Sequence, residues 1–183
     1  MALLETPPGE LGMKAPDFAL KGIDGKIWTR DQCRGPKGLL VMFICNHCPY
    51  VRAIIDRIVR DCRELQVLGF GSVAIMPNDT ERYPEDSFEN MKKFAEEHDF
   101  CFPYLIDETQ EVARAYGAVC TPDFFGFNAD LELQYRGRLD ESRKEPVPGA
   151  KRELLEAMSQ IALTGKGPEV QYPSMGCSIK WRS

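Results

Sequence analysis

The chain contains 183 residues, of which 43% are hydrophobic and 28% are charged, and its formal net charge is -5 at pH 7. This length and composition suit one globular domain over residues 1–183, with a core at about 14–163 and a C-terminal tail at 164–183. The basic residues are scattered rather than gathered in a stripe, which argues against nucleic acid as a partner. Apolar runs stay well short of a membrane span, so we expect no membrane partner either.

The seven cysteines bear on the compartment in which the protein works. An odd number of cysteines is unusual for a secreted disulfide scaffold. The first residues, Met1 to Pro8, lack the basic and apolar regions of a signal peptide, so we expect no export. We therefore predict a cytoplasmic protein, in which persistent disulfides are rare and transient ones are catalytic or sensing.

The first expected elements are a lead-in and a hairpin. Residues 1–14 are rich in proline and glycine and predict a weakly structured lead-in. Two short segments at 17–20 and 26–28 flank a glycine-bearing turn, which predicts a β-hairpin. Thr29 is the expected cap of a short helix that runs through Cys33.

A buried strand and an amphipathic helix are expected next. Residues 38–44 form an uninterrupted apolar run, which is typical of a buried strand. From Val51 onward, apolar residues recur every three or four positions, which predicts one buried helix face that ends near Gly69. The inward positions are Val51, Ile54, Ile55, Ile58, Val59, Cys62 and Leu65. Residues 72–76 predict the next buried strand, and a polar loop follows at 78–86.

The second half of the chain continues the alternation of helices and strands. Ser87 is the expected cap of an amphipathic helix over 88–95, and an extended segment follows at 103–107. Residues 109–116 predict a short helix with Gly117 at its C-terminal cap.

The last regular elements predict an antiparallel edge and a closing helix. Two strands at 123–127 and 132–138 form the expected antiparallel pair, and 150–163 predict a helix. The tail from 165 to 183 shows little regular pattern. Because helices separate most strands, we predict an α/β fold with a central mixed, mostly parallel sheet flanked by helices.

The stretch Cys45-Asn46-His47-Cys48-Pro49 joins the first buried strand to the helix that follows. We expect the strand to deliver both cysteines onto the first helical turn. A helix N-terminus carries unpaired N–H groups and a partial positive charge, so it favours a thiolate over a thiol. A second cysteine one turn away can attack a mixed disulfide and release the product. The sequence therefore predicts a redox protein that works through Cys45 and Cys48.

The order of elements, with Cys-x-x-Cys after a strand and Thr-Pro further on, resembles the thioredoxin fold with an N-terminal β-hairpin extension. More closely, it resembles the branch shared by TlpA/ResA-like thiol oxidoreductases and AhpC/TSA peroxiredoxins. The matching positions are Ala15-Pro16-Asp17-Phe18, Asp24-Gly25, Phe43-Ile44-Cys45-Asn46-His47-Cys48, Asp107, Tyr116-Gly117 and Val119-Cys120-Thr121-Pro122. In this strand–helix context the Cys-x-x-Cys signal is strong.

This resemblance implies a role for each residue of the site. Cys45 would be the attacking thiolate, being nearer the helix start and more exposed, and Cys48 the buried resolving thiol. Pro122 would be a cis-proline beside the disulfide, and Thr121 would offer its backbone to a bound partner peptide. The implied activity is thiol–disulfide exchange with protein or small-molecule thiols, including a thioredoxin or glutathione system, without an organic cofactor.

Departures from the family pattern concern the residues beside the cysteines. Thioredoxins usually have Trp where Ile44 stands and Gly-Pro where Asn46-His47 stands. A histidine at this position is similar to the motif of the disulfide isomerases. As a donor beside Cys45, His47 would favour the thiolate and stabilise the reduced form, which makes the disulfide a stronger oxidant than that of thioredoxin.

A peroxiredoxin-like peroxidase that reduces hydroperoxides is the alternative enzyme. Its signature, Pro-x-x-x-Thr/Ser-x-x-Cys, does not match here. Aligned on Cys48, it meets Cys45 and Val41, and aligned on Cys45, it meets Met42 and Gly38.

A thioredoxin-fold metal-binding protein is a further alternative, because two cysteines and a histidine can bind soft metals. Sco-type copper proteins, however, have a wider cysteine spacing and a distal histidine, whereas His98 ends a helix here. Structural zinc sites usually use two such cysteine pairs. We therefore assign no metal ligand.

Five cysteines lie outside the motif. Cys177 follows a glycine in the tail. One hypothesis is that it is a third redox thiol, which folds back onto Cys45 or Cys48. The alternative is a free thiol in the tail, with Trp181 packing on the rest of the domain. Cys120 and Cys62 fit small buried core residues better than redox groups. The loop with Asn78, Asp79 and Tyr83 follows a strand end and is either a border of the site or a solvated connector.

Overall fold

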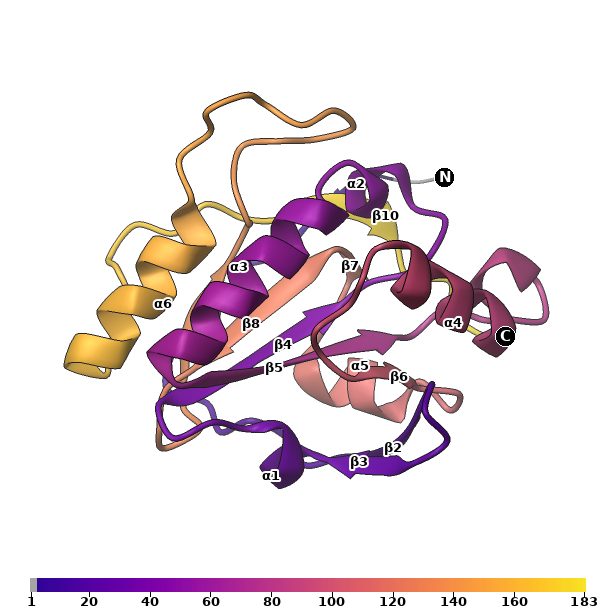
Figure 1. Ribbon diagram of the computed structural model, residues 1–183, viewed down its shortest axis with the longest axis horizontal. Helices are drawn as coiled ribbons and strands as arrows, with labels where there is room; N and C mark the ends of the chain where they lie inside the picture. Colours follow the sequence, from indigo (N-terminus) through magenta and orange to yellow (C-terminus); the bar gives the residue numbers. More distant parts are fainter. Residues whose placement is uncertain (1–2) are drawn as a thin grey trace.

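The computed structural model describes residues 3–183 and has the mixed sheet flanked by helices that the sequence predicts (Figure 1). The strands are β1 Leu3–Glu5, β2 Ala19–Gly22, β3 Ile27–Thr29, β4 Gly38–Phe43, β5 Phe70–Met76, β6 Tyr104–Ile106, β7 Cys120–Thr121, β8 Asp123–Phe127, β9 Leu133–Gly137 and β10 Met175–Ser178. The helices are α1 Arg30–Cys33, α2 Pro49–Arg52, α3 Ile55–Leu68, α4 Phe88–Glu97, α5 Glu111–Tyr116 and α6 Glu153–Thr164, with a 3₁₀ turn, η1, at Pro84–Asp86.

The main sheet has the strand order β3-β2-β6-β5-β4-β8-β9 within residues 3–183. Its central pairs β4/β5 and β5/β6 are parallel, and both ends are antiparallel. Every residue of β4 is buried, which explains its uninterrupted apolar sequence. The prediction of a mixed sheet with an antiparallel β8–β9 edge is confirmed. The prediction that this sheet is mostly parallel is wrong, because β2, β3, β8 and β9 all pair antiparallel and only β4/β5 and β5/β6 are parallel.

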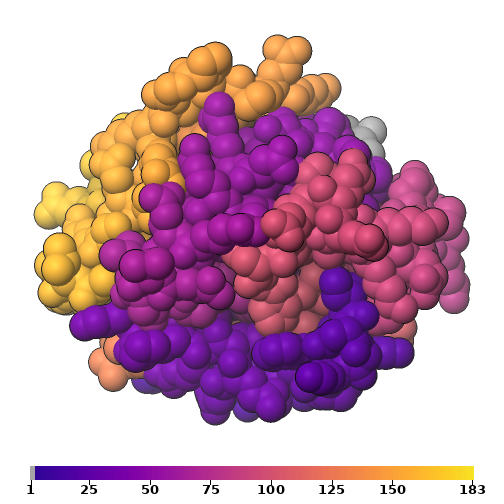
Figure 2. Space-filling view, viewed as in Figure 1, coloured from indigo at the N-terminus to yellow at the C-terminus, as the bar shows by residue number. Residues whose placement is uncertain are grey.

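Two apolar layers cover the sheet, one on each face. Side chains of α3, α4 and α6 form the larger layer, and in the space-filling view they cover the sheet on the side that faces the viewer (Figure 2). The opposite layer contains α5, the residues around Phe18, and the tail residues Ile179 and Trp181. Among the described helices, none combines the length and the apolar character that crossing a membrane requires.

Several local predictions are confirmed by the cap geometry. Thr29 accepts a hydrogen bond from the backbone N–H of Gln32 and forms a capping box at α1. Ser87 caps α4 by accepting a hydrogen bond from the backbone N–H of Asn90. Gly69 ends α3 with a φ of 99°, in the left-handed region where glycine has no steric penalty.

One predicted helix consists of two pieces. A single helix face was expected from Val51, but α2 is one turn long and α3 begins only at Ile55. Ile54 lies between them with a φ of -122° and a ψ of 3°, outside helical geometry. The apolar spacing did not show this break, because spacing reports which side is buried and not whether the backbone hydrogen bonds continue.

A second, three-stranded sheet corrects the predictions for both ends of the chain. Its order is β1-β10-β7, and both pairs are antiparallel. The lead-in over 1–14 therefore contains a strand, although its residues 1–2 lie outside the described part, and the tail from 165 to 183 contains another. These strands have only three or four residues, too few for an alternating pattern to appear in the sequence.

A buried ion pair fixes the start of β8 next to the Thr121–Pro122 peptide bond. The Nη2 atom of Arg136 donates to Asp123 Oδ2 at 2.9 Å, and both side chains are at least nine-tenths buried. The guanidinium also stacks on Phe125, with 4.5 Å to the ring centroid. Removing one partner of such a pair leaves an uncompensated buried charge.

We expect Arg136→Ala to lower the free energy of unfolding by roughly 3–5 kcal/mol, because the Asp123 carboxylate loses its partner. Lys92→Ala, which removes the exposed Lys92–Glu89 pair, is the matched control and should change it by less than about 1 kcal/mol. Urea denaturation measures both values. Equal losses in the two variants would contradict a special role of the buried pair.

Candidate functional site

The site lies where the chain leaves β4 and turns into α2. Cys48 is the N-cap residue of α2, and Pro49 is its first helical residue. Cys45 precedes this cap in the connecting loop and is 1% exposed, and Cys48 is fully buried. One expectation is therefore wrong, because Cys48 and not Cys45 lies at the helix start. The exposure expected for Cys45 is also absent, because both cysteines are buried. The expected burial of Cys48 is confirmed.

The loop between β7 and β8 forms the other wall of the site. The Thr121–Pro122 peptide bond is cis, as the resemblance implied. Cys48 Sγ lies 3.3 Å from the carbonyl oxygen of Thr121, and Cys45 Sγ lies 3.5 Å from its hydroxyl oxygen. Thr121 thus contacts both cysteines. The backbone of Thr121 also pairs with Cys177 of β10. Strand β10 therefore occupies the position at which we expected a partner peptide to pair with Thr121.

The C-terminal strand brings a third cysteine into the site. Cys177 Sγ lies 2.9 Å from Cys48 Sγ, although the two residues are 129 positions apart in the sequence. The hypothesis that Cys177 folds back onto the motif is confirmed as to position, and Cys177 is 95% buried. Trp181 also packs on the domain, where the guanidinium of Arg114 lies over its ring.

The three thiols differ in acidity because their surroundings differ. Hydrogen bonding with Cys45 and Cys177 lowers the pKa of Cys48 to about 5 against the opposing effect of burial. Burial raises the pKa of Cys45 well above its usual value, and the Cys48 and Asp86 charges raise it further. Burial and the neighbouring Cys48 also raise the pKa of Cys177 to about 12. Among these three thiols, only Cys48 has a lowered pKa.

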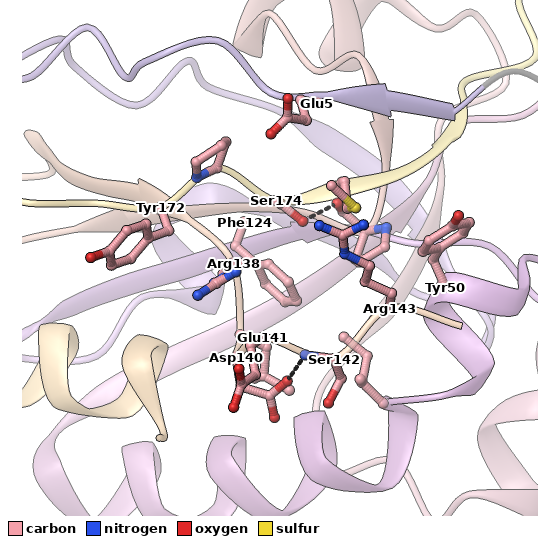
Figure 3. Close-up of a pocket in the computed structure, with 15 residues that line it drawn as sticks. Glu5, Tyr50, Phe124, Arg138, Asp140, Glu141, Ser142, Arg143, Tyr172 and Ser174 are labelled. Carbon is pink, nitrogen blue, oxygen red and sulfur yellow. Dashed lines mark hydrogen bonds between the residues drawn. The ribbon is translucent and has the colours of Figure 1, made fainter. Parts of the chain in front are cut away.

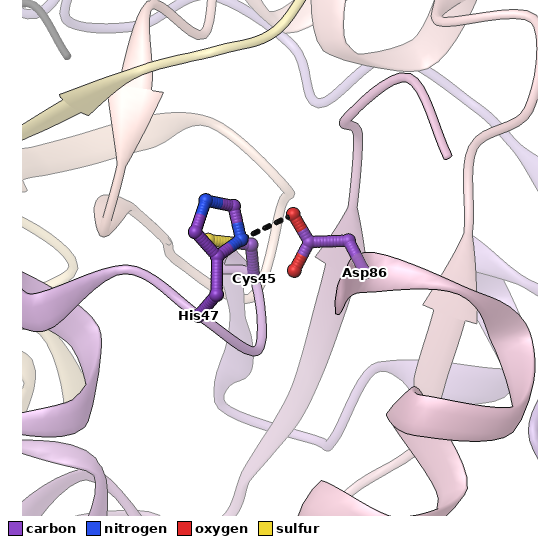
Figure 4. A group of neighbouring side chains, drawn as sticks. All are labelled: Cys45, His47 and Asp86. Carbon is purple, nitrogen blue, oxygen red and sulfur yellow. Dashed lines mark ion pairs between the residues drawn. The ribbon is translucent and has the colours of Figure 1, made fainter. Parts of the chain in front are cut away.

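His47 is held by an acidic residue that sequence reasoning missed. Its Nδ1 atom lies 2.7 Å from Oδ2 of Asp86, a fully buried residue of η1 (Figure 4). This contact raises the pKa of His47, against the effect of burial. The ring of Tyr83 stacks on His47 with a centroid separation of 6.1 Å. Asp86 closes the polar loop that the sequence predicted, but nothing in the sequence singles it out from the other acidic residues there.

The same carboxylate anchors the motif backbone. Asp86 Oδ1 accepts a hydrogen bond from the N–H of Asn46 at 2.8 Å, and Oδ2 accepts one from the side chain of Asn78 at 2.9 Å. Tyr104 donates to the side-chain oxygen of Asn46 at 2.7 Å. The loop after β5 is thus a wall of the site and not a solvated connector, because Asn78, Tyr83 and Asp86 all reach it.

Cys45, His47 and Asp86 also form a group with metal-ligating atoms within 4.8 Å of one another. Both oxygens of Asp86 are already engaged by hydrogen bonds and by His47, so these contacts explain the cluster without an ion. His98 takes no part in it, because it pairs with Asp56 at the end of α4.

The remaining cysteines near the motif fit their expected places. Cys120 and Cys62 are buried in the core, and burial raises the pKa of each thiol. The Cys120 thiol donates to the carbonyl oxygen of Pro122 at 3.6 Å. Among the described residues, it makes no hydrogen bond to a cysteine of the motif.

A cavity of about 160 Å³ lies beside the cis-proline, with Tyr50, Arg138 and Ser174 among the labelled residues around it (Figure 3). Its lining includes Pro122, Tyr50 of α2, Met175 of β10, Glu141 and Arg143. Ser174 Oγ donates to the Pro122 carbonyl oxygen at 2.7 Å beside it. Neither Cys45 nor Cys48 lines this cavity, so the thiols are covered in this conformation.

Fold and site together define a thioredoxin-like protein with a buried cysteine pair at a strand–helix junction. The model of the AhpC/TSA family matches residues 11–136, which is more than half of the chain. The protein therefore belongs to the AhpC/TSA family.

Among curated proteins, the chain is similar to the thiol-disulfide oxidoreductase ResA of Geobacillus thermodenitrificans. The two are 27% identical over 122 residues, which cover 63% of this chain and 62% of the relative. The chain thus matches less than two thirds of that relative's length.

Solved structures confirm the fold. An uncharacterized conserved protein from Geobacillus kaustophilus is 47% identical and superposes with a TM-score of 0.93, covering 100% of this chain and 97% of its own. A putative thiol:disulfide interchange protein DsbE from Chlorobium tepidum is 22% identical, with a TM-score of 0.61 and coverage of 84% and 98%. The second likeness concerns the fold alone.

We expect Asp86→Asn to lower the pKa of His47, because the amide keeps the shape of the carboxylate and removes its charge. A raised pKa in the folded state stabilises the protein below the unfolded-state pKa of histidine, and this stabilisation is lost as pH rises through the folded-state pKa. The stability difference from wild type should therefore shrink with rising pH. NMR titration of the ring protons checks the pKa, and His98, the other histidine of the chain, is the internal control. An unchanged His47 midpoint would contradict the assignment.

Proposed function

We propose that this protein is a thiol–disulfide oxidoreductase whose redox pair is Cys45 and Cys48. The observation that carries the proposal is the Cys48 sulfur, which has a lowered pKa at the N-cap of α2, beside Cys45 and the cis-proline loop. A thiolate at neutral pH is the nucleophile that disulfide exchange requires. The substrates are protein or small-molecule disulfides and thiols, and a thioredoxin or glutathione system is the proposed electron partner.

The relatives support an enzyme of the oxidoreductase class. The ResA protein from Geobacillus is named a thiol-disulfide oxidoreductase, and so is the ResA protein of Bacillus thuringiensis, which is 24% identical over 149 residues. The cytoplasmic location predicted from the cysteine content stays a prediction.

The reaction needs two exchange steps and no cofactor. In the first, a thiolate of the pair attacks a substrate disulfide, one substrate sulfur leaves with its electron pair, and a mixed disulfide forms. In the second, the other cysteine of the pair attacks the mixed disulfide, and the second substrate sulfur leaves. The result is a Cys45–Cys48 disulfide and a reduced substrate, and the reverse sequence oxidises a dithiol.

The order in which the two cysteines act is a separate part of the proposal. The family resemblance assigned the first attack to Cys45. The lowered pKa of Cys48 and its place at the helix start favour the opposite order. The variant that accumulates a mixed disulfide identifies the attacking residue, because it lacks the residue that would resolve it.

His47 is the proposed positioning and tuning residue of the pair. Its charged form is favoured by Asp86, and the Cys48 thiolate favours it further. A positive charge beside the site stabilises the reduced form, which makes the disulfide a stronger oxidant.

A peroxiredoxin-like peroxidase is the second candidate, because the chain belongs to the AhpC/TSA family. If Cys48 is taken as the peroxidatic cysteine, the peroxiredoxin signature requires Thr or Ser at position 45, where this chain has Cys45. Stopped-flow oxidation of the reduced protein by hydrogen peroxide separates the two. A rate no faster than that of a free thiol supports the oxidoreductase, and fast oxidation lost in Cys48→Ser supports the peroxidase.

We expect Cys48→Ser to abolish reduction of insulin disulfides by dithiothreitol, with a rate loss at least on the order of 10³-fold, because both exchange steps need its sulfur. Thiolate absorbance at 240 nm should titrate near pH 5 in the wild type and vanish in this variant. Cys101→Ser, a half-buried thiol outside the site, is the control and should behave as the wild type. Full activity of Cys48→Ser would refute the proposed pair.

A further inference from the structure

The C-terminal strand covers the redox pair and places a thiol against it. Strand β10 lies between β1 and β7, with Cys177 opposite Thr121 in the register, and passes beside α2 (Figure 1). The sulfur atoms of Cys177 and Cys48 are 2.9 Å apart, and a disulfide bond is about 2.05 Å long. A small approach of the two side chains therefore suffices for bonding.

Contacts on both sides of Cys177 hold it at this place. Gly176 lies so close to β7 that an added Cβ would stand 1.9 Å from the carbonyl oxygen of Thr121, so only glycine permits this approach. Before it, Ser174 donates to the Pro122 carbonyl oxygen. After it, the N–H of Lys180 donates to the side-chain oxygen of Asn78 at 2.9 Å. Cys177 is therefore a positioned thiol rather than a loose tail residue.

The cover also explains why the redox pair has no open surface in this conformation. Cys45 and Cys48 are at most 1% exposed, and the cavity beside Pro122 is bounded by Met175 rather than by either sulfur. In this conformation both sulfurs are buried from an external disulfide, whereas Cys177 is already in contact with Cys48.

We propose that Cys177 is a third redox thiol that exchanges disulfide partners with Cys45 at the shared sulfur of Cys48. The proposal rests on the redox pair proposed above. Cys177 attacks Cys48 of the Cys45–Cys48 disulfide, the bond between those two sulfurs breaks, and a Cys48–Cys177 bond forms. Cys45 leaves with the electron pair and takes up the proton that Cys177 gave up. The step consumes no oxidant or reductant, so it conserves the oxidation state of the protein.

The chemical setting changes in the direction that this step needs. In the reduced site, burial and the Cys48 thiolate keep Cys177 protonated. When Cys48 enters a disulfide with Cys45, its negative charge disappears and the nearby Lys180 still favours the Cys177 thiolate. Oxidation of the pair thus removes the charge of Cys48 that opposes a Cys177 thiolate, whereas burial continues to oppose it. The product of the exchange fastens β10 to the site while it frees Cys45.

Disulfide mapping of the full-length protein tests the exchange. The reduced protein and its Cys45→Ser, Cys48→Ser and Cys177→Ser variants are oxidised with diamide, trapped by alkylation in acid and mapped by mass spectrometry. We expect Cys48–Cys177 in Cys45→Ser, Cys45–Cys48 in Cys177→Ser and neither in Cys48→Ser. In the oxidised wild type, alkylated Cys45 should accompany the Cys48–Cys177 bond. Circular dichroism verifies that each variant folds. If the buried hydroxyl of Cys45→Ser prevents folding, Cys45→Ala replaces that variant.

The outcomes separate this inference from the function on which it rests. If Cys45→Ser leaves Cys48 and Cys177 as free thiols, or if the wild type contains only Cys45–Cys48, the exchange is refuted and the redox pair stands. If Cys177→Ser forms no Cys45–Cys48 disulfide and the wild type does not reduce insulin, the proposed function fails. If no Cys45–Cys48 disulfide forms but a Cys48–Cys177 bond is found, that bond did not arise by the proposed exchange, and the inference is refuted as well.

Discussion

The buried sulfur of Cys48 is the point on which the arrangement of the site depends. A thiolate in an apolar interior is unfavourable unless donors surround it. Here Cys45 and Cys177 lower the pKa of Cys48, and the two residues come from the β4–α2 loop and from β10. The segments that carry them must therefore dock before the site acquires its acidity. Folding of the tail and chemistry at the motif are linked by this contact.

A second set of contacts holds the motif from the opposite side. Asp86, itself fully buried, accepts hydrogen bonds from the Asn46 N–H and the Asn78 side chain and lies 2.7 Å from His47. One carboxylate thereby fixes the backbone between the two cysteines and favours the charged form of the histidine. Position and electrostatics come from the same group, which is the arrangement expected where a reactive loop needs rigid support.

Much of the fold was predictable from local sequence. The buried strand over residues 38–44, the capped helices at Thr29 and Ser87 and the glycine at position 69 all depend on neighbours within a few residues. The two short strands β1 and β10 were missed for the opposite reason. Each is stabilised by a partner more than a hundred residues away, and nothing in a four-residue segment shows that partner.

The sequence by itself determined the chemistry that is present: a Cys-x-x-Cys motif between a strand and a helix, a Thr-Pro further on, and a cysteine in the tail. Only the tertiary structure decided how that chemistry is arranged. It buried Cys45, placed Cys48 at the helix start, joined His47 to Asp86 and brought Cys177 to within 2.9 Å of Cys48. The reason is physical: residue type sets which bonds a group can form, whereas acidity and reach depend on burial and on neighbours that meet only when distant segments pack.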